Sequence, residues 1–208
     1  LMFLASLVAC GFALYGLADF PSQQLAVLGV ALAIAALTSQ FQLTIPGTSI
    51  RISAKELSVF LGTIWLGVPG AVLLAVATSF ARIGLSDKPR FDRFFSVFND
   101  VTAGFISAIV FYFTLSNLAG FNAKYVADQP VEPLWLVAGL GISATVHFFA
   151  VRILNSLFAF LKQKEVVYES LQTQLLRTVV PYLVNLANVL LFHFLFTFFG
   201  LAFGWVVL

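Results

Sequence analysis

Residues 57–82 read LSVFLGTIWLGVPGAVLLAVATSFAR, a stretch whose only charged residue is the final Arg82. An apolar helix needs about 20 residues, at about 1.5 Å each, to cross a hydrocarbon layer of about 30 Å. The stretch is long enough for one crossing, but Gly67, Pro69 and Gly70 interrupt it, because a proline has no amide donor for the helix. We predict either one bent span or a membrane-dipping hairpin of two half-length helices.

The composition of the whole chain also indicates a membrane protein. Hydrophobic residues make up 61% of the 208 residues, charged residues only 10%, and the mean hydropathy is +1.01. A water-soluble core cannot hide that much apolar surface. Further apolar runs occupy residues 1–18, 25–37, 94–118, 134–161 and 179–199. We predict one all-α membrane domain over residues 1–208, a polytopic transmembrane bundle of six to seven spans with a broken helix.

Two connecting segments have patterns of their own. Residues 40–53, QFQLTIPGTSIRIS, alternate polar and apolar residues around a Pro-Gly turn, which predicts a hairpin-like extended loop packed as a cap at the membrane surface. Residues 162–177 are more polar and are expected to form a connector helix. Both chain ends lie inside apolar runs, so we expect a piece of a longer polypeptide with a soluble output domain after residue 208.

Basic residues predict the orientation. Residues 82–93 hold four Lys and Arg residues and residues 162–177 hold three, whereas residues 119–133 hold only Lys124. The first two segments should face the cytoplasm. The loop that carries Arg51 and Lys55 shares that side if residues 57–82 only dip, and lies opposite if they cross. Charge counting slightly favours the cytoplasmic side.

Ala5, Ala9 and Ala13 recur every four residues in the first apolar run and form a small-residue face for close helix packing. This face either packs inside the bundle or contacts a partner subunit.

Asn99 and Asp100 lie about one turn inside an apolar run, where an ionised carboxylate needs a partner or water. The alternatives are a structural ion pair of Asp100 with Arg93 or Arg152, and a ligand or proton site to which Arg51 of the hairpin loop would contribute.

Other polar residues inside the apolar runs are further ligand-binding candidates. His147 is expected to form a hydrogen bond across a helix interface, with ligand binding as the alternative. Asn185 and Asn188 follow Pro181 at helical spacing, so all three should face the bundle interior, as hydrogen-bonding glue or as a substrate contact.

Several function classes are not supported. The formal net charge of +2 is too small to indicate a nucleic-acid partner. The chain has no phosphate-binding glycine loop, no metalloprotease histidine motif and no nucleophile elbow, so we expect no enzymatic activity, no metal and no cofactor within these residues.

Three neighbouring motifs carry a family resemblance: IPGTSIRIS at residues 45–53, LSVFLG at 57–62 and LGVPGAVLLA at 66–75. A basic loop ending at Arg93 and the segment FFSVFN at 94–99 follow them. Over residues 42–117 the chain resembles the amino-terminal membrane region of bacterial signalling proteins that carry HD-GYP or GGDEF domains. It is also similar to the S components of energy-coupling-factor vitamin transporters. It departs from both in Val68, and from the S components in its extra leading span.

The first resemblance implies a sensory or anchoring input module in the bacterial inner membrane, whose cytoplasmic domain makes or degrades cyclic di-GMP. Its partners would be the lipid bilayer, a small-molecule or lipid ligand, and a second copy or another membrane subunit. The alternatives are a substrate-binding transport subunit and a structural subunit of a larger membrane complex, for which the small-residue face would be the contact.

Overall fold

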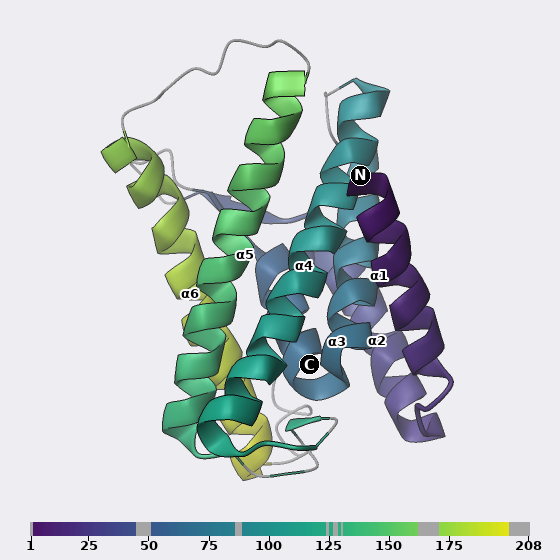
Figure 1. Cartoon of the computed structure of the whole chain (residues 1–208), viewed down its shortest axis with the longest axis vertical. Coiled ribbons are helices and arrows are strands. Elements are labelled where there is room, and N and C mark those ends of the chain that lie inside the picture. Colours follow the sequence, from purple (N-terminus) through teal and green to yellow (C-terminus); the bar gives the residue numbers. More distant parts are fainter. Residues whose placement is uncertain are drawn as a thin grey trace.

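The structure, a computed structural model, describes residues 2–44, 51–85, 89–123, 125, 126, 129, 131–161 and 171–199. Within these ranges the chain is a helical bundle with a small two-stranded ribbon at one end (Figure 1). The helices are α1 (Met2–Leu17), α2 (Ser22–Thr38), α3 (Ala54–Ala81), α4 (Arg90–Ala119), α5 (Pro133–Leu161) and α6 (Leu171–Phe199), with a 3-10 turn at Ile83–Leu85. The predicted all-helical bundle is confirmed.

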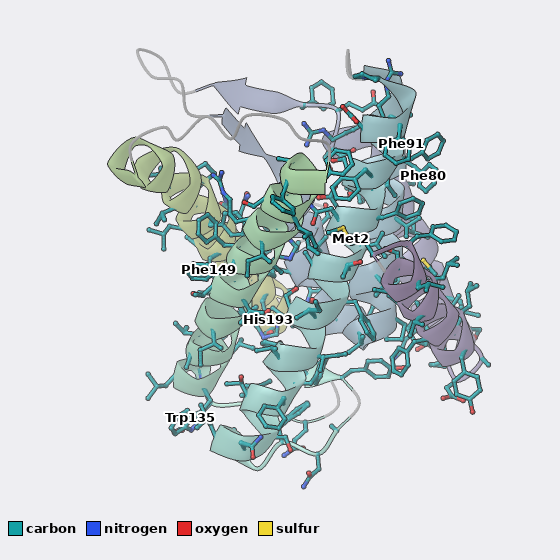
Figure 2. The ribbon with its side chains drawn as sticks, turned by 45° about the horizontal axis from the view of Figure 1, so that its top comes forward. Met2, Phe80, Phe91, Trp135, Phe149 and His193 are labelled. Atoms are coloured by element: carbon teal, nitrogen blue, oxygen red, sulfur yellow. The ribbon has the colours of Figure 1, made fainter. Side chains whose placement is uncertain are left out.

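The helices have the length and the outer surface of a membrane protein. Four of them contain segments long and apolar enough to cross a bilayer: Ala54–Ala81, Phe91–Ala119, Pro133–Phe160 and Val179–Phe198. α1 and α2 are shorter apolar helices. Large apolar side chains project outward, among them Phe80, Phe91 and Phe149, which Figure 2 labels. Such a surface is stable against lipid and not against water.

The two strands of the predicted hairpin-like loop are present. β1 (Gln42–Thr44) pairs antiparallel with β2 (Arg51–Ser53), with Leu43 opposite Ile52. The Pro-Gly turn that joins them lies outside the described residues.

α3 turns back on itself at Gly67. This residue has φ 68° and ψ −164°, a backbone conformation open essentially to glycine alone. A Cβ on Gly62 would lie 2.4 Å from Leu74 Cδ1 and 3.2 Å from the Gly70 carbonyl carbon. In a straight helix residues 62 and 74 would be about 18 Å apart. The two halves of α3 therefore lie side by side as a hairpin of two half-length helices, and α3 is not one bent helix.

The hairpin packs against α4 and α1 through small residues. A Cβ on Gly104 of α4 would lie 3.4 Å from Ala75 and 3.5 Å from Val59, one residue from each arm of the hairpin. Ala9 and Ala13 of α1 are fully buried in the same core cluster. The small-residue face is thus used inside the bundle, and its use as a contact for a partner subunit is wrong for these two alanines.

α6 combines two segments that the sequence analysis expected to be separate helices. The sequence predicted a separate connector helix at 162–177 before a span at 179–199, but residues 171–177 are already the first turns of α6, which continues through Pro181. Residues 162–170 lie outside the described part of the chain.

The hairpin puts the basic segments at one end. In Figure 1 the strand ribbon, the beginning of α4, the end of α5 and the beginning of α6 lie at the top, and the α4–α5 connection lies at the bottom. Because α3 enters and leaves at the top, Arg51 of β2, the segments with Arg82 and Arg93, and the beginning of α6 with Arg177 belong to the same end. The α4–α5 connection belongs to the other end, as the charge pattern predicted for a dipping α3.

Candidate functional site

Asp100 of α4 holds the two arms of the α3 hairpin together. Lys55 Nζ, at the start of the first arm, lies 2.5 Å from Asp100 Oδ1. Ser79 Oγ, near the end of the second arm, donates a hydrogen bond of 2.8 Å to Asp100 Oδ2. The side chains of Lys55 and Asp100 are only 11% and 10% exposed. One buried carboxylate therefore ties together positions that are 24 residues apart in the sequence.

The expectation that Asp100 needs a partner is confirmed, but the expected partners are wrong. Arg93 donates to the Ile83 carbonyl oxygen at 3.2 Å, and the Arg152 guanidinium lies 5.6 Å from the centre of the Phe148 ring. Lys55 takes the role instead, because the reversal of α3 brings its first turn back beside α4.

The depth of Asp100 suits an ionised group. Nineteen residues separate it from Ala119, the last residue of α4. At about 1.5 Å per residue this is about 28 Å, close to the thickness of a hydrocarbon layer. If α4 leaves the hydrocarbon layer at Ala119, the ion pair lies near the other boundary of that layer, at the basic end, where a charge costs less than at the centre.

A second polar contact links the hairpin to α6. Asn185 Nδ2 donates to Glu56 Oε2 at 3.4 Å, and Asn185 is only 2% exposed. Glu56 follows Lys55 directly and lies within electrostatic reach of Asp100 and Arg82. Asn185 therefore faces the interior as predicted, and it connects α6 with the base of the hairpin.

Asn99 belongs to a different interface from Asp100. Its Nδ2 donates to Asn155 Oδ1 of α5 at 2.8 Å, and its Oδ1 is buried without a hydrogen-bond partner among the described residues. Successive residues of a helix point about 100° apart, so Asp100 faces α3 while Asn99 faces α5. The structure thus does not bring these two candidates into one site.

His147 forms the hydrogen bond across a helix interface that was predicted for it. Its Nδ1 lies 3.2 Å from Ser107 Oγ of α4, and Ser143 Oγ donates to the Ser107 carbonyl oxygen at 2.8 Å. The ring packs against Phe60 and Tyr182, with ring centres 5.6 and 5.9 Å apart. These contacts fill the space between α3, α4, α5 and α6.

The other two ligand-binding candidates lie apart from this cluster. Arg51 is part of β2, and its side chain lies outside the described residues. Asn188 is half-buried on α6, one turn below Asn185, and forms no side-chain hydrogen bond with a described residue.

Three members of the polar cluster were not predicted as site residues: Lys55, Glu56 and Ser79. The signal for the first two was an adjacent Lys-Glu pair directly before an apolar run. We assigned Lys55 to the loop, whereas α3 begins at Ala54 and carries both charges into the bundle. Nothing in the sequence indicated that Ser79 would be a site residue, because buried serines in membrane helices often bond their own backbone.

This polar cluster can bind a charged group and can connect the helices that carry its residues. It combines one ammonium group, two carboxylates, a hydroxyl and an amide, in the residues Lys55, Glu56, Asp100, Ser79 and Asn185. Within the described ranges, no group of three or more His, Cys, Asp or Glu residues is placed to hold a metal ion.

Comparison of the chain with protein-family models, with curated proteins and with solved structures found no match.

Proposed function

We propose that the chain is the membrane-embedded sensory input module of a bacterial signalling protein, and that movement of the α3 hairpin carries the signal. The observation that supports this proposal is that Asp100 bonds both arms of the hairpin, through an ion pair with Lys55 and a hydrogen bond from Ser79. A helical hairpin that dips into a membrane without crossing it can move while the crossing helices keep their places.

The Lys55–Asp100 ion pair is suited to a switch between two states, one with the hairpin held against α4 and one with it released. Removing one partner of a buried ion pair costs about 3–5 kcal/mol, because the other charge is left uncompensated. A charged ligand that pairs with Lys55 or with Asp100 would supply that compensation and release the hairpin. The ligand shifts the equilibrium only if it binds the released state more tightly than the closed one.

α6 carries the first step from the hairpin toward the output. Because α6 runs from the basic end to the opposite end, a cytoplasmic output domain of the same polypeptide requires one further crossing of the membrane after α6. Glu56 adjoins Lys55 in the chain and contacts Asn185 of α6, so a displacement of the first arm changes the packing of α6. The family resemblance implies that the output is the synthesis or breakdown of cyclic di-GMP by a cytoplasmic domain of the same polypeptide.

The test is to express the full-length protein with Lys55→Met, with Asp100→Asn and with the reversed pair Lys55→Asp/Asp100→Lys, and to measure cellular cyclic di-GMP. We expect both single variants to change its level and the reversed pair to move it back toward the wild-type value. Thr145→Ala is the matched control, since Thr145 is exposed on α5 and bonds only the Gly141 carbonyl oxygen of its own helix. Unchanged levels in all variants, at equal abundance in the membrane, would contradict the sensory proposal.

A transport subunit similar to the S components is the second candidate, and the hairpin also favours it. Non-helical backbone at membrane depth is tolerated where it is buried in protein or lines a cavity, and broken helices surround the substrates of many transporters. Co-purification of the chain with a membrane coupling protein and nucleotide-binding subunits would support transport. A phosphohydrolase or cyclase domain in the same polypeptide would support signalling.

A further inference from the structure

We propose that the α3 hairpin opens at its base while Tyr112 keeps its tip docked, so that the two arms swing together about the tip. This inference rests on the proposed movement of the hairpin and specifies how that movement is constrained. The base is the end of the hairpin that Asp100 of α4 bonds through Lys55 and Ser79. The tip is the turn at Gly67.

Segments from the end opposite the basic one pack around the tip. The backbone of α1 lies directly against it, since a Cβ on Gly16 would lie 2.5 Å from Pro69 Cγ. Leu66 belongs to a buried cluster with Phe20 of the α1–α2 connection and Tyr125 of the α4–α5 connection. The rings of Phe20 and Tyr125 meet edge to face, with centres 5.7 Å apart. Both connections lie at the bottom of the bundle in Figure 1, away from the ion pair at the base.

A hydrogen bond from α4 adds to this docking. Tyr112 Oη donates to the Thr63 carbonyl oxygen at 2.8 Å, and Thr63 is fully buried. Thr63 lies in the last turn of the first arm, where the carbonyl groups of a helix need partners from outside that helix. Tyr112 is seven residues from Ala119 and twelve from Asp100, or about 10 Å and about 18 Å along α4. If α4 leaves the hydrocarbon layer at Ala119, this bond lies well inside the layer.

Access to water makes the base easier to open than the tip. By the same measure along α4, the ion pair of Lys55 and Asp100 lies near the boundary of the layer, where water can solvate the released charges. The Thr63 carbonyl oxygen has no such substitute in hydrocarbon, where an unsatisfied backbone group is costly. Loss of the ion pair should therefore open the base and leave the tip bonded.

The contacts between base and tip allow the two arms to turn as a unit. Within the hairpin the arms are closely packed, because a Cβ on Gly62 would lie 3.2 Å from the Gly70 carbonyl carbon. Against α4 the contacts are made by small residues, and a Cβ on Gly104 would lie 3.4 Å from Ala75 and 3.5 Å from Val59. Small side chains form shallow ridges on a helix, so they oppose a rotation of the hairpin over α4 only weakly.

The test measures distances between spin labels by pulsed electron paramagnetic resonance, in the full-length protein in nanodiscs and with Cys10 replaced by alanine. One pair of labelled cysteines, Phe80→Cys/Ile153→Cys, reports on the base, since both side chains are exposed at that end of the bundle. The other pair, Val68→Cys/Leu118→Cys, reports on the tip.

We expect Lys55→Met to shift the distance at the base by about 5 Å and to leave the distance at the tip unchanged. Arms of about 18 Å that turn by about 15° about the tip move their far ends by about this much. Ser79→Ala is a second variant that keeps both charges paired, and it should shift the base in the same direction by less. Adding Tyr112→Phe to Lys55→Met should shift the tip as well. Thr145→Ala is the control and should change neither distance.

Three results would overturn the proposal. They are equal shifts of base and tip in Lys55→Met, an unchanged base in both Lys55→Met and Ser79→Ala, and an unchanged tip when Tyr112→Phe is added to Lys55→Met. Failure of the sensory proposal gives a different result. A shift at the base with an unchanged level of cyclic di-GMP would contradict that proposal and would still support the swing about the tip.

Discussion

Asp100 and Lys55 are two charged side chains that are buried together, so each compensates the charge of the other. Each is ionisable, each is about nine-tenths covered, and they meet across the interface between α3 and α4. The sequence was sufficient to predict that Asp100 needs a partner, because an isolated carboxylate at that depth is costly. It was not sufficient to identify Lys55, since that pairing exists only when α3 reverses.

Replacing Asp100 by leucine should destabilise the protein by about 3–5 kcal/mol, since Lys55 is left buried without a counter-charge. The double variant Lys55→Met/Asp100→Leu should recover most of that loss, because two apolar side chains of similar size can replace a buried pair. Thermal unfolding in detergent, followed by circular dichroism, measures both effects. A double variant as unstable as the single one would show that the ion pair does not act as a unit.

Glycines in α3 and α4 determine the shape of the α3 hairpin. The break was predictable, because proline and glycine interrupt helices in any context. Its direction was not, since a half-length helix can continue at an angle or return beside its partner with equal propensity. The return is determined by contacts between segments, such as Gly62 against Gly70 within α3 and Gly104 of α4 against both arms.

Substituting alanine for Gly70 or Gly67 should destabilise the hairpin. A Cβ on Gly70 would lie 2.2 Å from Leu66 Cβ and 3.1 Å from the Gly62 carbonyl oxygen, which forces the arms apart at a cost of about 1–3 kcal/mol. At Gly67 the cost is similar, because its backbone conformation strains any residue with a side chain.

Gly29→Ala is the control for both substitutions. A Cβ at this position of α2 meets nothing within 4 Å, so alanine should be neutral or slightly stabilising in the helix. Melting temperatures of the three variants in the same detergent provide the comparison. Equal stability of Gly70→Ala and Gly29→Ala would contradict close packing of the two arms.

The orientation of the whole molecule follows from combining the charge counts with the hairpin. Composition and periodicity predicted the helical bundle, and the basic segments predicted which connections share a side. The position of the strand ribbon was left open, because it depended on whether α3 crosses. Once α3 is known to turn back, the ribbon joins the other basic segments at one end (Figure 1).

Cysteine labelling in intact cells tests this arrangement. After Cys10 is replaced by alanine, single cysteines at Arg51 in β2 and at Asn122 in the α4–α5 connection should react with a membrane-impermeant thiol reagent from opposite sides. Only the cysteine at position 122 should be accessible from outside the cell. Labelling of both positions from the same side would show that α3 crosses the bilayer.

The reversal of α3 also has a consequence for how the chain is inserted into the membrane. An element that returns to the side from which it came adds 28 residues to the chain without changing the parity of the crossings. α4, α5 and α6 therefore keep the same inside-outside order whether α3 enters the bilayer early, late or only after they have been placed. The hairpin is free to be the last part of the bundle to dock and the first to leave it, with no inversion of any other helix.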